Sequence, residues 1–80
     1  MNLPSQTVMM MERYKGYLIH GTARAMPDSP EWRSEGTVFV QRGQGSVIQI
    51  QHLEGAIFED RQLAEAHGLA LCMKWIDKRS

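Results

Sequence analysis

The chain has 80 residues, of which 42% are apolar and 22% charged, values that exclude a disordered or fibrous protein. This length predicts a single domain with a small core. Nine Lys and Arg residues balance nine Asp and Glu residues, so no net charge draws the chain toward nucleic acid or anionic lipid.

The sequence predicts a cytoplasmic protein with no membrane partner. Residues 1–8 lack the basic and apolar regions of a secretory signal, and no apolar run approaches the roughly 20 residues of a membrane span. Cys72 is the single cysteine, so a reduced and buried thiol is its expected state. We expect residues 1–12 to form a flexible N-terminal arm and residues 13–80 to form one domain.

Two strands joined by a hairpin loop are predicted in the first half of the chain. Residues 14–25 alternate with a period of two, which predicts a strand with one buried face. Residues 26–31 contain two prolines and predict a loop. Residues 32–42 alternate again and predict the second strand, with Gly21 facing Gly36 across the pair. We expect this glycine pair to leave a dent in the core face that Trp75 fills.

The segment Gly-Gln-Gly at 43–45 predicts a three-residue turn into a third strand at about 46–53. A loop of this length pairs Val40 with Ile48 and Val38 with Ile50, which keeps aliphatic side chains on one face. A loop one residue shorter would move every side chain of the third strand to the opposite face.

A C-terminal helix is predicted from Arg61, with Asp60 as its N-cap. The spacing i, i+3, i+4, i+7 predicts one apolar stripe that packs on the sheet. Its members are Ala64, His67, Gly68, Leu71, Cys72, Trp75 and Ile76. The predicted fold class is therefore α+β: a two-layer, three-stranded antiparallel β-meander packed against one C-terminal α-helix, in the order β-β-β-α.

No pattern predicts a catalytic, cofactor or metal site. His20, His52 and His67 fall on three different predicted elements, and the chain has no CxxC, HxxxH or HExxH spacing. The glycine-containing segments at 16–21 and 43–45 are not followed by a predicted helix, so neither can cradle a phosphate at a helix N-terminus. We therefore predict a protein that is not an enzyme and that binds no cofactor or metal.

Two surfaces are candidates for contact with a partner. Leu69 and Met73 lie one turn apart, roughly opposite the predicted core stripe, and predict an exposed ridge suited to a homodimer or a protein partner. The outer face of the sheet is the second surface. It combines an aromatic ring with basic and imidazole groups: Phe39, Arg24, Arg33 and His20.

This mixture of side chains on the outer face fits protein contact, and it also resembles a sheet that stacks bases. In the predicted register Arg24 opposes Arg33, a like-charge pair that an anion or an acidic side chain would relieve. The leading hypothesis is a non-enzymatic protein-interaction module with an unknown partner or a second copy. The alternative is weak binding of RNA or a small ligand on the outer face.

Several motifs resemble those of a group of short bacterial proteins of unknown function. These share a YxGY start and an F-x-[TSD]-x-x-x-A … WID helix, and the matching residues here are YKGY at 14–17, Trp32, Phe58, Asp60, Ala64, Leu71 and WID at 75–77. The resemblance implies the fold, because its motifs occupy core and cap positions, and it implies no catalytic residue. More distantly, the β-β-β-α order is similar to the core of HicB-type antitoxins, which bind a toxin and add a DNA-binding segment.

Overall fold

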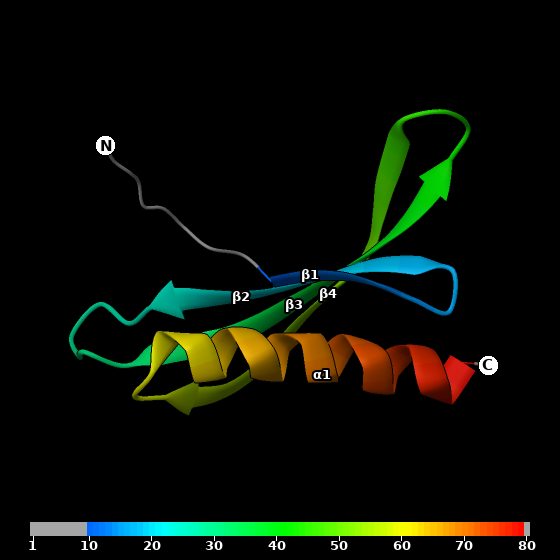
Figure 1. The fold of residues 1–80 in the computed structure, drawn as a ribbon. Helices are drawn as coiled ribbons and strands as arrows, with labels where there is room; N and C mark the ends of the chain where they lie inside the picture. Colours follow the sequence, from blue (N-terminus) through cyan, green and yellow to red (C-terminus); the bar gives the residue numbers. More distant parts are fainter. Residues whose placement is uncertain (1–9, 80) are drawn as a thin grey trace.

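The computed structural model describes residues 10–79 as one four-stranded antiparallel sheet with one helix on one of its faces (Figure 1). The strands lie in the sheet in chain order. They are β1 (Met10–Tyr14), β2 (Tyr17–Ala25), β3 (Trp32–Arg42) and β4 (Ser46–Phe58), and the helix is α1 (Arg61–Arg79). The predicted two-layer α+β arrangement, with an antiparallel meander and a C-terminal helix, is confirmed.

The number of strands differs from the prediction, because the segment 14–25 is not one strand: it contains the end of β1, a turn and β2. Lys15 and Gly16 form its turn, with φ values of 49° and 88°. Positive φ at both central residues is what a type I′ turn requires, and its twist matches that of the flanking strands. Three strands were predicted, and residues 10–79 contain four.

The additional strand, β1, begins at Met10, inside the segment 1–12 that was expected to be a flexible arm. It pairs antiparallel with β2 along its whole length, from Met10 opposite Gly21 to Tyr14 opposite Tyr17. Residues 1–9 of the predicted arm lie outside the described residues, so the prediction for them stays open.

The turn at 43–45 and the pairing of Val40 with Ile48 are confirmed, but the pairing of Val38 with Ile50 is wrong. Val38 pairs with Gln51, because the register shifts between Val38 and Phe39 and leaves Ile50 as the extra residue of a β-bulge. A bulge of one residue reverses the alternation of the strand beyond it. The β4 residues from Gln51 to Glu54 therefore face the opposite way from the predicted one, up to a second register shift opposite Arg33 and Glu35.

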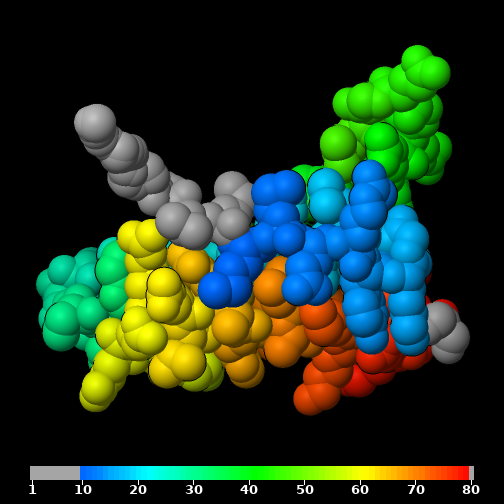
Figure 2. Space-filling model, viewed as in Figure 1, coloured from blue at the N-terminus to red at the C-terminus, as the bar shows by residue number. Residues whose placement is uncertain are grey.

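At the bulge the end of the β3–β4 hairpin bends away from the sheet and the helix and projects from the body of the protein (Figures 1 and 2). We call residues 39–51 the hairpin arm. Beyond the arm, β4 continues to Phe58, five residues past the predicted end of the third strand at Leu53.

The predicted start of the helix is confirmed. Asp60 accepts a hydrogen bond from the backbone N–H of Gln62 at 3.3 Å, and its carbonyl oxygen accepts one from Ala64 at 3.1 Å. The side chain thus satisfies one of the amides that a helix N-terminus leaves without an intrahelical partner.

The dent made by Gly21 and Gly36, which do face each other, is filled by the backbone of α1 at Gly68 and not by Trp75. A Cβ atom on Gly68 would lie 3.1 Å from the Cα of Gly21 and within 2.1 Å of the carbonyl oxygen of Glu35. The three glycines therefore bring helix and sheet closer together than side chains would allow. Trp75 is only partly buried and packs at the margin of the core.

The face of α1 that meets the sheet is rotated from the predicted one, so the predicted exposed ridge of Leu69 and Met73 is wrong. Leu69 is only 8% exposed and belongs to the core, and Met73 packs against that core. The buried helical residues are Ala64, Glu65, Gly68, Leu69, Cys72 and Ile76. At about 100° per residue, Glu65 points toward the middle of this face. Its carboxylate is buried and lies 3.3 Å from Nε of Arg61.

Candidate functional site

The sheet face that points away from α1, the outer face, carries a group of charged and polar side chains from three strands. Glu35 on β3 lies opposite Glu54 on β4, and Thr37 lies opposite His52 in the same pair of strands. Arg24 reaches them from β2. We call Arg24, Glu35, Thr37, His52 and Glu54 the outer-face cluster.

Arg24 holds two carboxylates together in this cluster. Its Nη2 lies 2.9 Å from Oε2 of Glu35 and 3.1 Å from Oε2 of Glu54. Two like charges on directly opposed residues of a sheet destabilise the pair, and the guanidinium between them relieves the repulsion. The Arg24 side chain is mostly exposed, whereas that of Glu35 is largely covered.

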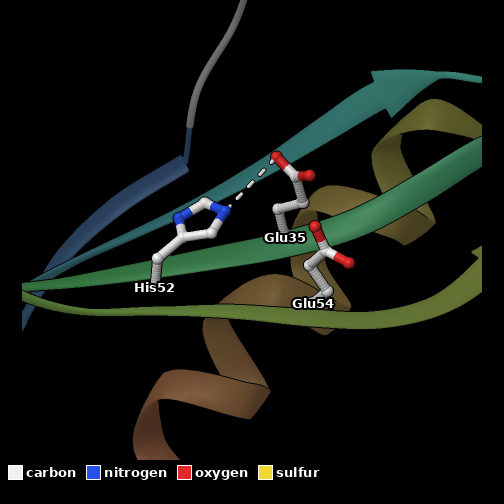
Figure 3. A group of neighbouring side chains, drawn as sticks. All are labelled: Glu35, His52 and Glu54. Atoms are coloured by element: carbon white, nitrogen blue, oxygen red, sulfur yellow. Dashed lines mark ion pairs between the residues drawn. The ribbon is translucent and has the colours of Figure 1, made fainter.

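His52 is fixed by its neighbour on β3. Its Nδ1 lies 3.0 Å from the hydroxyl oxygen of Thr37, a buried residue, and its Nε2 is turned toward Oε1 of Glu35 at 3.7 Å (Figure 3). That second distance is too long for a hydrogen bond. Glu35, His52 and Glu54 each contribute one nitrogen or carboxylate oxygen to a group of three atoms that lie within 4.8 Å of one another. The imidazole is therefore oriented by one nitrogen while the other faces a carboxylate across a gap.

The bulge in β4 is the reason that the sequence did not predict this cluster. With the predicted register, Gln49, Gln51 and Leu53 would share the outer face. In the structure, His52 and Glu54 occupy that face after Ile50, next to Glu35 and Thr37. The spacing His-x-Glu at 52–54 was a visible signal, but nothing in the sequence joined it to Glu35.

The predicted residues His20 and Phe39 contact each other at one end of this face. Their rings lie 4.5 Å apart between centroids at an interplanar angle of 47°. The Nε2 atom of His20 is buried and has no hydrogen-bond partner among the described residues. Burial lowers the pKa of His20 below its ordinary 6.5, so the neutral ring is favoured. Phe39 is partly covered and is not a free stacking platform.

Arg24 and Arg33 stand opposite each other as predicted, and acidic side chains relieve the like-charge pair. Arg33 donates from Nη1 to the carbonyl oxygen of Gly55 at 3.0 Å. Both guanidinium groups thus have acceptors within the protein, which weakens the support for an RNA-binding face. Leu69 and Met73 lie on the other side of the sheet, so the predicted interaction residues do not form one surface.

The hairpin arm presents a second candidate surface. Val47, Ile48 and Ile50 are 47%, 46% and 41% exposed, although each is a large aliphatic residue. Arg42 is the only charged residue of the arm. The arm tip also stays open, because nothing lies within 4 Å of a Cβ placed on Gly43. Val47 and Ile48 are consecutive strand residues and point to opposite faces, so the arm presents aliphatic side chains on both faces. Their neighbours are uncharged polar residues, a mixture that suits the middle of a protein interface.

Comparison with known proteins finds no match to this chain among protein-family models, curated proteins or solved structures. The resemblances to the short bacterial proteins and to HicB-type antitoxins therefore stay predictions. Across residues 10–79, no helix combines the length and the apolar character needed to cross a bilayer.

Proposed function

We propose that this chain is a non-enzymatic protein-interaction domain that self-associates through the hairpin arm. The observation that carries the proposal is the exposure of Val47, Ile48 and Ile50 on a segment that projects from the body of the protein. Large aliphatic side chains that cluster on a protruding hairpin mark a contact site more often than scattered ones do.

The partner that fits the arm best is a second copy of the chain. A strongly charged partner would have only Arg42 to pair with, and its other charges would lose water without compensation. A second arm offers the same aliphatic and amide groups, and a two-fold axis places identical patches against each other. The chain also has a net charge of zero, so two copies do not repel each other.

The expected affinity is modest. Covering the exposed half of one aliphatic side chain contributes roughly 1 kcal/mol, so two such side chains on one face of the arm, from each of two copies, give about 4 kcal/mol. Association costs at least about 4 kcal/mol in lost freedom of movement, and backbone hydrogen bonds along the open edge of β4 add to the gain. We therefore propose a dimer that forms with increasing concentration and not a permanent one.

The absence of enzymatic activity is part of the proposal and is supported by the state of the reactive groups. Burial raises the pKa of the Cys72 thiol to about 11, so little thiolate exists at neutral pH. Glu35 and Glu54 are both paired with Arg24. A protein-interaction role needs no group in a reactive state.

Sedimentation equilibrium over protein concentrations from about 1 μM to about 1 mM tests the proposal. We expect the average mass to rise above the 9.1 kDa of one chain, and Ile48→Lys to remain at that mass throughout. The matched control is Leu63→Lys, because Leu63 is 57% exposed but lies on α1, away from the arm. Wild-type protein that stays monomeric, or a Leu63→Lys protein that dissociates like Ile48→Lys, would contradict the proposal.

A further inference from the structure

We propose that Glu35, His52 and Glu54 form a binding site for a divalent transition-metal ion, for which Zn²⁺ is the best match. The three side chains rise from neighbouring strands on the outer face and point toward a common region (Figure 3). Their donor atoms already lie within 4.8 Å of one another. This site is separate from the hairpin arm and does not depend on self-association.

The distance between His52 and Glu35 is close to the separation of two ligands that bind one ion. Nε2 and Oε1 are 3.7 Å apart, beyond hydrogen-bond range. Two ligands of a tetrahedral zinc ion with bonds of 2.0–2.1 Å lie about 3.3 Å apart. The pair needs to close by only about 0.4 Å, and the exposed side chain of Glu54 can rotate to supply the third ligand.

The orientation of His52 provides an independent argument. A metal-binding imidazole commonly donates its other N–H to a fixed acceptor, which sets the tautomer and aims the free nitrogen at the ion. The hydroxyl of the buried Thr37 lies 3.0 Å from Nδ1 of His52 and can accept that proton. With the proton on Nδ1, the lone pair of Nε2 points at a carboxylate. A cation between the two groups stabilises this tautomer, whereas without one the Thr37 hydroxyl can donate to Nδ1 and the proton can sit on Nε2.

The charges around the site favour a cation but limit its affinity. The two carboxylates and the one guanidinium together leave one negative charge in excess. Arg24 contacts Oε2 of each carboxylate, so the second oxygen of Glu35 and of Glu54 remains for the metal. The positive charge of Arg24 then opposes that of the ion at short range.

The chemical types of the three ligand side chains indicate which metal ion the site prefers. One imidazole and two carboxylates suit zinc and its neighbours in the first transition row, whereas magnesium and calcium take oxygen ligands. Three protein ligands leave a fourth zinc position for water. The thiol of Cys72 does not compete, because it is buried beneath the inner face and its pKa is about 11.

Calorimetric titration of the full chain with Zn²⁺ at neutral pH tests the site. We expect saturation at one ion per chain, and His52→Gln and Thr37→Val to weaken binding by about tenfold or more. Arg24→Gln should bind several-fold more tightly, because the substitution removes the positive charge that opposes the ion. The matched control is His67→Gln on α1, which should leave the affinity unchanged.

Two further measurements keep the test decisive. Circular dichroism spectra and thermal midpoints show whether each variant is folded, and excess Zn²⁺ should raise the midpoint of Arg24→Gln more than that of the wild type. In proton NMR spectra the ring signals of His52 should shift with metal while those of His20 stay in place. Absence of saturable binding, or a folded His52→Gln protein that binds Zn²⁺ like the wild type, would overturn the proposal.

Discussion

Replacing Gly68 by Ala places a methyl group at the closest contact between α1 and the sheet. That Cβ would lie within 2.1 Å of the carbonyl oxygen of Glu35 and 3.1 Å from the Cα of Gly21. Both neighbours are backbone atoms that cannot rotate away. Because ordinary contact begins at 3.4 Å, the helix has to retreat by about 1 Å.

The cost follows from the side chains that lie between the two layers. These are Ile19, Val38, Leu69, Cys72 and Ile76. Burial of these five side chains contributes about 10 kcal/mol to the free energy of unfolding. A gap of this size removes roughly a quarter of the packing contribution, or about 2 to 3 kcal/mol. The better helix propensity of Ala returns about 1 kcal/mol. We expect a net destabilisation of about 1 to 2 kcal/mol, which lowers the thermal midpoint by about 10 °C in a domain of this size.

Thermal and urea unfolding followed by circular dichroism measure this loss. The control is Ala70→Gly at an exposed position of α1, which should cost about 1 kcal/mol through helix propensity alone. If propensity alone governed position 68, Gly68→Ala would be more stable than the wild type by a similar amount. A Gly68→Ala protein that melts at or above the wild-type temperature would refute the close approach of helix and sheet.

Three further predictions concern titratable groups. The hydrogen bond from Lys15 to Asp77 holds the pKa of that carboxyl below its ordinary 3.8, so its contribution to stability is complete above that pH and is lost as the pH falls below it. Asp77→Asn should flatten this acid limb of a plot of thermal midpoint against pH, and an unchanged limb would contradict the contact. Burial lowers the pKa of His20, so the unfolded chain binds more protons just below pH 6.5 and stability falls there. His20→Gln should remove this fall in the thermal midpoint between neutral pH and about pH 5, and a variant that keeps the fall would assign it to another group. Cys72 should react with a thiol reagent such as DTNB only as fast as the protein unfolds, and rapid labelling without urea would show that it is accessible.

The sequence predicted the parts of the fold that depend on regular patterns. The alternating segment 32–42 has the same bounds as β3. The predicted pairing of β2 with β3 correctly placed Gly21 opposite Gly36. The polar side chain of Asp60 marked the helix start. Each of these signals is local, so no tertiary contact was needed to read it.

The turn between β1 and β2 was missed because its sequence is an unusual one for a hairpin. Asn-Gly and Asp-Gly are the common pairs for a turn with two positive φ values, whereas here a lysine takes the first of these positions with φ 49°. The alternation of residues 14–25 also continues across the turn. The pattern therefore fits one long strand as well as it fits a turn followed by β2.

The rotation of α1 was missed because of one buried charge. Glu65 lies near the middle of the buried face, whereas helical charges usually point to solvent. The ridge that continues from Glu65 through Leu69 to Met73 was therefore read as exposed. Its contact with the sheet depends on the space that Gly21 leaves, which is a tertiary property and leaves no mark in the helical spacing.

The outer-face cluster was missed because a single bulge decides its composition. The residues around Ile50 contain no glycine or proline that would mark an irregular strand. Shifting the register there exchanges which residues of β4 share a face with Glu35. The site therefore follows from strand pairing and could not be predicted from strand patterns alone.

The contact of Gly68 with the Gly21–Gly36 pair determines which face of the sheet is covered and which stays open to a metal ion. Nuclear Overhauser effects between α-protons in isotopically labelled protein measure this contact most directly. We predict a strong cross-peak between the α-protons of Gly68 and Gly21, and none from any α1 proton to the ring of His52. Cross-peaks from α1 to His52 or Glu54, with the glycine contact missing, would place the helix on the other face and contradict both sites.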